Sequence, residues 1–435
     1  MRYRCPYEYR QLNKKDAILS YIITPDISIM FITAFDIDCA LIAHHSKRKG
    51  TFGDIIDTSS KCPPIVNSAR IAYEFNSKSY HFRKIKVSHV KKNTFGFRTI
   101  FLMHIEDFAV QKAALNKFER TYPDFFDNSV YAYRKKFGPS KMVKSMYNLI
   151  RKKNLRFMLH VDTKNFSESV NLSILKYLIF NYIHDEEFQY LLISYISPAR
   201  LEEKDKSLFA EDKGLYNGGP LSCFLLNLYF IKFDFFARNF IDAQYYRYGD
   251  DIFIFSDNLE TLTRYYKIIK IYLYINLGLS VHELEENGKS CIVSLDKDSY
   301  FHFYDYSFNF HEIRIREPVV IKILHYISSI INKHFVVIDA INEINFFFAS
   351  AANYLDYSNN CYFLCFSICT RASQFSYIDK QIRNLIYARF GKKKEVYEAV
   401  NNQLILLKIS IITLKKSKDL QNDITKYFTR IHYIC

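Results

Sequence analysis

The fold is decided by residues 245–255, which read Tyr-Tyr-Arg-Tyr-Gly-Asp-Asp-Ile-Phe-Ile-Phe. Two β-prone runs, residues 245–248 and 252–255, flank a Gly-Asp-Asp turn. This pattern predicts a β-hairpin that carries Asp250 and Asp251 at its tip. A pair of Asp residues in a turn is ordinary turn chemistry by itself. The hairpin therefore indicates a functional site only if a further carboxylate joins it.

A short apolar run, residues 157–161, has strand length and leads directly into Asp162. If this strand and the hairpin are neighbours in one sheet, three carboxylates converge at its end, and such a cluster requires cations. Mg²⁺ prefers carboxylate oxygens together with substrate phosphates. Two ions roughly 3.5–4 Å apart stabilise the attacking and leaving oxygens of a displacement at phosphorus. We therefore predict that Asp162, Asp250 and Asp251 are catalytic and bind two Mg²⁺ ions, for which Mn²⁺ can substitute.

A basic segment, residues 91–98, places β-prone runs around Gly96. It predicts a small hairpin whose Lys91, Lys92 and Arg98 hold a triphosphate electrostatically. A solvated basic face is the plain structural alternative.

Glycine is rare in this chain, so a glycine cluster is informative. Three of the eleven Gly, at positions 214, 218 and 219, precede Pro220 and an apolar run. This pattern predicts a loop that approaches a base pair or phosphate closely, followed by a helix that begins at Pro220. Further along, Lys289 is a candidate general acid for a leaving pyrophosphate.

Composition supports a polyanionic partner. The chain of 435 residues carries a net charge of +15 and is 49% hydrophobic, which favours a folded protein that binds nucleic acid or an anionic surface. No uncharged apolar run reaches the roughly 18 residues of a membrane span, and the first residues lack a signal-peptide core. The nine Cys are irregularly spaced and are interpreted as reduced thiols. We expect a cytoplasmic protein with no membrane association.

The linear order of these features resembles the palm of a right-hand polymerase. In particular, the chain resembles a reverse transcriptase of the bacterial retron, group II intron and abortive-infection lineage, over roughly residues 80–310. The residues that carry the resemblance are Lys91–Ile100, Tyr131–Lys135, Asp162–Phe166, Gly214–Ser222 with Asn227, Tyr248–Asp251, and Leu277–Leu279 with Lys289.

The resemblance implies an α+β right-hand fold with basic fingers, an antiparallel RRM-like palm sheet with flanking helices, and an α-helical thumb. With the helical periodicity of the last third of the chain, it predicts an N-terminal region and fingers over 1–155, a palm over 156–310 with a fingers insertion at about 175–213, and a thumb with C-terminal extension over 311–435. The implied nucleotide-binding residues are Lys91, Lys92, Arg98, Thr163, Phe166, Ser167, Gly218 and Ser222. The implied nucleic-acid-binding residues are Arg134, Lys135, Lys136, Gly214, Gly219, Asn227 and Tyr248.

By the same resemblance, the expected activity is RNA-directed DNA polymerisation from dNTPs, with a structured noncoding RNA and the DNA product as partners. A role in anti-phage defence, a homo-oligomer or a second defence protein, and protein-primed or untemplated synthesis are also implied. Ser167 stands where the family usually has the Phe or Tyr that blocks a 2′-hydroxyl, so sugar selectivity depends on whether Phe166 or another ring fills that space. Two alternatives stay open: an RNA-dependent RNA polymerase, favoured by Ser167 and Gly-Asp-Asp, and a non-catalytic RNA-binding scaffold.

Overall fold

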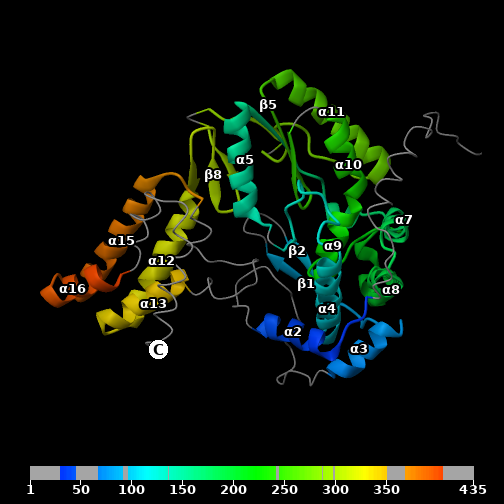
Figure 1. The fold of residues 1–435 in the computed structure, drawn as a ribbon, viewed down its shortest axis with the longest axis horizontal. Coiled ribbons are helices and arrows are strands. Elements are labelled where there is room, and N and C mark those ends of the chain that lie inside the picture. Colours follow the sequence, from blue (N-terminus) through cyan, green and yellow to red (C-terminus); the bar gives the residue numbers. More distant parts are fainter. Residues whose placement is uncertain are drawn as a thin grey trace, which may run out of the picture.

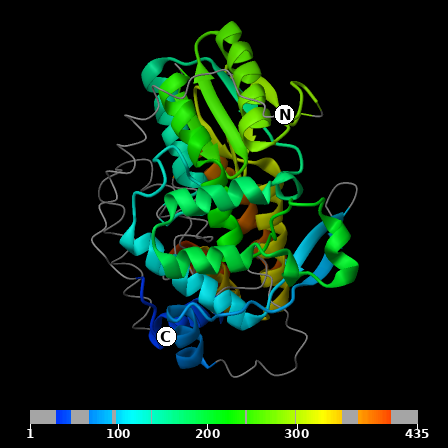
Figure 2. The same cartoon turned by 90° about the vertical axis from the view of Figure 1, so that its right-hand side faces the viewer.

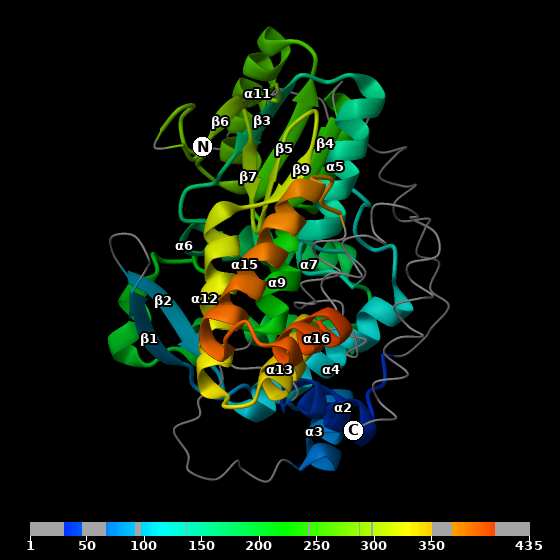
Figure 3. The same cartoon turned by 90° about the vertical axis from the view of Figure 1, so that its left-hand side faces the viewer.

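The computed structural model describes residues 30–45, 67–91, 97–135, 137–241, 244–286, 288–296, 299–349 and 368–404. At its centre lies an antiparallel sheet with the strand order β4-β5-β3-β6, and Figure 3 shows these strands side by side. Val161 is opposite Ile252, and Tyr248 is opposite Asp251, so the predicted hairpin and the predicted strand are neighbours. The strands are β3 Phe157–Val161, β4 Gln244–Tyr248, β5 Asp251–Ser256 and β6 Cys291–Ser294.

The two faces of this sheet contribute to different cores because side chains alternate along each strand. Leu159 and Ile254 point into the largest core, which includes residues of helices α9, α10 and α11. Met158 and Phe253 point into a second core formed with helix α5 and a small three-stranded sheet. A slip of one residue would exchange the two faces, so burial fixes the register. The helices are α5 Pro139–Lys153, α9 Pro220–Tyr229, α10 Ile231–Phe240 and α11 Leu259–Leu277.

The small sheet leads into a helical bundle. Its strands β7 Phe301–Phe303, β8 Tyr306–Phe308 and β9 Ile313–Ile315 are antiparallel in that order. The next helices surround a core of their own, and Figure 1 shows them as a bundle beside the rest of the molecule. The predicted helical character is confirmed for the described part of this region. The helices are α12 Glu317–Lys333, α13 Val337–Ala349, α15 Ala372–Phe390 and α16 Lys394–Gln403.

The N-terminal part contains a two-stranded antiparallel hairpin, β1 Lys86–Lys91 and β2 Phe97–Leu102. Figure 2 shows this hairpin at one side of the molecule, away from the central sheet. Helices join the hairpin to the palm-like core through the same large cluster of apolar side chains. They are α2 Ala34–His45, α3 Ser68–Asn76, α4 Ile105–Thr121, α6 Phe166–Ser169, α7 Leu172–Tyr182 and α8 Glu186–Tyr195, with 3₁₀ turns η1 Pro198–Arg200 and η2 Glu203–Leu208.

One stretch of the described chain, Pro220–Phe240, is long and apolar enough to cross a membrane by length and composition alone. It comprises α9 and α10, and 67% of its most apolar window is buried inside the protein. Leu221, Leu225 and Phe233 of this stretch belong to the large core. We therefore interpret α9 and α10 as core helices.

The predicted α+β class is confirmed by the antiparallel sheets and the helices that cover them. The predicted helix start at Pro220 is also confirmed. The domain boundaries at residues 155 and 310 stay predictions.

Candidate active site

The two acidic segments end at the same edge of the central sheet. Asp162 directly follows Val161, whose partner Ile252 is next to Asp251. One residue further, the Thr163 hydroxyl donates a hydrogen bond of 3.2 Å to Oδ2 of Asp250. The structure therefore brings Asp162, Asp250 and Asp251 together, although about 90 residues separate them in the chain.

The turn that presents Asp250 depends on Gly249. Its φ of +67° lies in the left-handed region, which a residue with a Cβ rarely adopts. Space is not the constraint, because an added Cβ would lie 3.8 Å from the Tyr133 ring, an ordinary contact distance. The glycine is required by the backbone of the tight β4–β5 turn.

Each carboxylate has a different polar partner. Oδ2 of Asp162 lies 3.0 Å from Nζ of Lys289, and the Asp162 amide donates to the hydroxyl of Ser290 over 3.1 Å. Oδ1 of Asp251 lies 2.8 Å from Nε2 of His160. Lys289 and His160 therefore neutralise the carboxylates of Asp162 and Asp251.

The carboxyl of Asp250 has an unusual acidity. Burial, followed by the nearby charges of Asp251 and Asp162, raises its pKa to about 6. Burial is the largest single effect on His160 and opposes its protonation, but the hydrogen bonds and charges of Asp251 and Cys291 together outweigh it and raise the imidazole pKa to about 9. At neutral pH the His160 ring is therefore a cation beside Asp251.

The chemistry of this donor set fits Mg²⁺. Among the described residues, no three His, Cys, Asp or Glu side chains are arranged as a ready-made metal site. The three carboxylates nevertheless supply the hard oxygen ligands that Mg²⁺ prefers, and burial together with the charges of Asp251 and Asp162 raises the Asp250 pKa. The side chain of Lys289 is 56% exposed, so its ammonium can leave Asp162 without disturbing the core.

The residues that were predicted to lie near the nucleotide sugar have partners within the protein. Phe166 was predicted to contact the nucleotide, but its ring is 5% exposed and stacks on Phe230 with the centroids 5.6 Å apart. The ring is therefore part of the core in this structure, and its contact with a nucleotide stays a prediction. The Nδ2 of Asn217 instead donates to the Ser167 hydroxyl over 2.6 Å, which leaves a polar pair at this position.

The glycine loop is tightly packed. A Cβ at Gly219 would lie 2.6 Å from the Cε of Met103, and one at Gly214 would lie 2.3 Å from the Phe209 ring. The buried hydroxyl of Ser222 donates to the Gly219 carbonyl over 2.6 Å. Ser222 therefore stabilises the start of α9, and its contact with a nucleotide stays a prediction. A Cβ at Gly218 would lie 3.3 Å from the Phe101 carbonyl, so this loop rests on β2.

Two residues that were predicted to contact nucleic acid have partners within the protein. Asn227 is 1% exposed, its Nδ2 donates to the Ala132 carbonyl, and its Oδ1 accepts from Arg247, so it is a structural hydrogen-bonding residue. The Arg134 guanidinium donates to the carbonyls of Asp127 and Val130 and lies over the Phe137 ring. Both groups are occupied within the protein.

The other predicted contacts are more accessible or are not described. Lys135 is exposed and lies 3.6 Å from Glu119. The ring of Tyr248 lies against those of Phe303 and Tyr304, with centroids 5.3 and 5.0 Å away. Lys136 lies outside the described residues.

The basic hairpin is present as predicted in its backbone. Lys91 pairs with Phe97, and Arg98 pairs with Val90, so both residues belong to the paired strands β1 and β2. The tip of the hairpin, with Lys92, lies outside the described residues.

His160 is a site residue that the sequence reasoning missed. It precedes Asp162 by two positions, and in a strand such residues share a face. That alternation was the available signal, but it was obscured because the whole 157–161 run was treated as apolar.

Comparison with known proteins gives a family match for part of the chain. Residues 90–284, just under half of the chain, match the family described as reverse transcriptase (RNA-dependent DNA polymerase). No curated protein matches the sequence. Residues 90–284 thus match a reverse transcriptase domain, and this match supports RNA-directed DNA polymerase activity, a nucleotidyl transfer.

Solved structures similar to the chain include two fungal telomerases. Apo telomerase from Candida tropicalis is 15% identical with a TM-score of 0.42, and the match covers 80% of this chain and 68% of that one. Telomerase from Candida albicans, in complex with a TWJ fragment of telomeric RNA, is 11% identical with a TM-score of 0.39, and the match covers 80% of this chain and 66% of that one.

Proposed function

We propose that this chain extends a primer on an RNA template, with two Mg²⁺ ions held by Asp162, Asp250 and Asp251. The observation that carries the proposal is the convergence of these three carboxylates at one edge of the sheet. When bound, Mg²⁺ would stabilise the attacking and leaving oxygens at the α-phosphorus of the incoming nucleotide.

The basic residues around this edge have complementary roles in the proposal. Lys289 reaches the carboxylate cluster, since its Nζ lies 3.0 Å from Asp162. In this proposal it would give a proton to the pyrophosphate that leaves when the primer hydroxyl attacks. Lys91, Lys92 and Arg98 of the fingers hairpin would hold the triphosphate.

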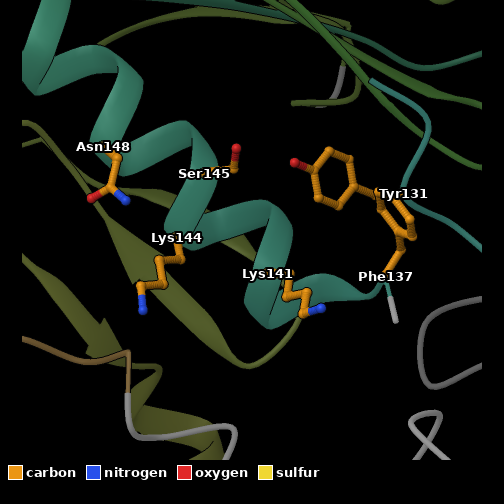
Figure 4. Close-up of a pocket in the computed structure, with 6 residues that line it drawn as sticks. All are labelled: Tyr131, Phe137, Lys141, Lys144, Ser145 and Asn148. Atoms are coloured by element: carbon orange, nitrogen blue, oxygen red, sulfur yellow. The ribbon is translucent and has the colours of Figure 1, made fainter. Parts of the chain in front are cut away.

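A groove beside the catalytic hairpin supports the binding of nucleic acid. Figure 4 shows Lys141, Lys144 and Asn148 along α5, with the rings of Tyr131 and Phe137 across from them. The groove has a volume of about 360 Å³, and no acidic residue lines it. Two ammonium groups beside aromatic rings suit a phosphate backbone with an adjacent base.

The position of this groove links it to the active site. The Tyr246 hydroxyl lies 3.3 Å from that of Ser145, which lines the groove. Tyr246 precedes Tyr248 by two positions on β4, so the strand residue that contacts the groove lies about 7 Å along β4 from Tyr248, which leads into the catalytic turn. A nucleic-acid strand that leaves the active site across β4, the edge strand of the sheet, would enter this groove.

The finer biological role is also part of the proposal. We expect a structured noncoding RNA as template or scaffold, and a function in bacterial anti-phage defence. The resemblance of the motif set to retron and abortive-infection enzymes supports this role. Sequencing the RNA and DNA that copurify with the protein would identify template, product and priming end. Recovery of no specific RNA would contradict this part of the proposal.

Substitution of the carboxylates tests the activity itself. Asp162→Ala and Asp250→Ala should each abolish incorporation of labelled dNTPs on a primed RNA template while the circular dichroism spectrum is retained. Asp257→Ala is the matched control, because Asp257 follows the opposite end of β5 and is exposed. Retained polymerisation in the Asp162 or Asp250 variant would overturn the proposed site.

An RNA-dependent RNA polymerase is a second candidate that one observation favours. The polar Ser167–Asn217 pair provides no ring against a 2′-hydroxyl, and the neighbouring Phe166 is buried. Parallel assays with NTPs and dNTPs would separate the two functions, since incorporation of ribonucleotides alone would favour this candidate.

A further inference from the structure

Arg247 is a fully buried charge at the back of the catalytic hairpin. It belongs to β4, and its side chain is 0% exposed. A buried guanidinium is costly unless all its donors are satisfied, so its partners indicate what it stabilises.

Two of its partners lie on the core helices. Nε and Nη2 donate to Oδ1 and Oδ2 of Asp234 on α10, each over 2.7 Å, in a two-pronged pair. Nη1 donates to Oδ1 of Asn227 on α9 over 3.0 Å. The guanidinium is therefore fixed in position by two core helices.

The remaining bond connects this charge to the active site. Nη1 of Arg247 also donates to the carbonyl oxygen of Gly249 over 2.7 Å. That carbonyl belongs to the peptide that joins Gly249 to Asp250. Because the carbonyl and N–H of a trans peptide point in opposite directions, a carbonyl held towards Arg247 directs the Asp250 N–H away from the core.

We propose that Arg247 is a positioning residue that locks the Gly249–Asp250 peptide and so sets the direction of the Asp250 carboxylate for metal binding. The metal part rests on the proposed function, in which Asp250 is a ligand. Gly249 is the flexible element on which the lock acts, because its left-handed φ of +67° is held by a turn of only two residues. A charge-assisted bond to the carbonyl restricts rotation of this peptide.

The test replaces the buried ion pair by apolar side chains of similar volume. Asp234→Leu combined with Arg247→Met should fold with reduced stability, because the replacement of a buried pair is often tolerated, while Asn227 and Tyr245 each lose a buried partner. This double variant lacks the hydrogen bond from Arg247 to the Gly249 carbonyl. The matched control is Asp107→Leu with Arg200→Met, which removes another buried Asp–Arg pair, 1% and 3% exposed, that has no bond to the turn.

Two measurements then decide. Without metal, amide exchange of the 248–252 segment should become faster in the Asp234/Arg247 variant and stay unchanged in the Asp107/Arg200 variant. With Mn²⁺ as probe, calorimetry should show a roughly 10- to 100-fold loss of affinity in the first variant only, the range found when groups that orient metal ligands are removed. Wild-type exchange and wild-type Mn²⁺ affinity in a folded Asp234/Arg247 variant would overturn the proposal.

The same experiment distinguishes this failure from failure of the proposed function. Mn²⁺ binding that survives in Asp250→Ala would show that the metal site is wrong. The exchange measurement would still decide whether Arg247 holds the turn, because it needs no metal.

Discussion

The groove on α5 gives a quantitative prediction for nucleic-acid binding. Lys141 and Lys144 are exposed, and no acidic side chain lines the groove with them. Their substitution by Ala should weaken binding of a primed RNA template by removing two phosphate contacts. Each contact releases counterions and contributes about 0.7 to the slope of log K against log salt for a single strand and about 0.9 for a duplex.

The expected magnitude follows directly. Loss of two contacts should make the slope shallower by about 1.4–1.8. Between about 50 and 200 mM salt, the difference in affinity between wild type and variant should therefore shrink roughly tenfold. Fluorescence anisotropy of a labelled template across this range measures both the slope and the affinity.

A matched control separates the groove from net charge. Lys392→Ala with Lys393→Ala removes the same charge from exposed positions between α15 and α16, at the far end of the helical bundle in Figure 1. Its salt slope should stay close to that of the wild type. Equal changes in both double variants would refute the groove, because they would show a general effect of charge.

Three further predictions concern chemistry and stability. Ser167→Phe should raise the preference for dNTPs over NTPs by adding a ring at the sugar position, and an unaltered ratio in competition assays would show that another side chain selects the sugar. Lys289→Ala should lower the single-turnover rate by roughly 10²- to 10⁴-fold if this lysine is the general acid, whereas a normal rate would limit it to neutralising Asp162. Ile254→Ala, at a site that is 0% exposed, should lower the free energy of unfolding by about 2–5 kcal/mol in urea denaturation, while Ile275→Ala, at a site that is 70% exposed, should change it by less than about 0.5 kcal/mol.

The acidic cluster could be predicted because its determinants are local. A β-prone run, a Gly-Asp-Asp turn and a second run define the hairpin, and an apolar run before Asp162 defines the neighbouring strand. The hairpin and the strand depend on short-range sequence patterns, which the chain displays clearly. The pairing of β3 with β5 joins segments about 90 residues apart; it was a condition of the prediction, and the structure supplies it.

The sequence does not reveal the surroundings of residues whose partners come from distant parts of the chain. Asn227 has the polarity of a ligand-binding residue, yet its amide is used by Ala132 and Arg247, which are 95 and 20 positions away. Phe166 lies next to the polar Ser167, but its ring stacks on Phe230 in the core. Polarity and ring type alone do not reveal which partners a folded chain supplies.

The order of strands in the central sheet has a consequence for synthesis of the protein on the ribosome. β3 is an inner strand whose two hydrogen-bonding neighbours, β5 and β6, follow it by about 90 and about 130 residues in the chain. At translation speeds of about 5–20 residues per second, β3 would wait on the order of ten seconds with both edges unpaired. The unpaired N–H and C=O groups of such an edge can pair with strands of other chains, so the nascent chain is most vulnerable to aggregation during this interval. A chaperone that shields the segment at this stage would raise the yield of active protein.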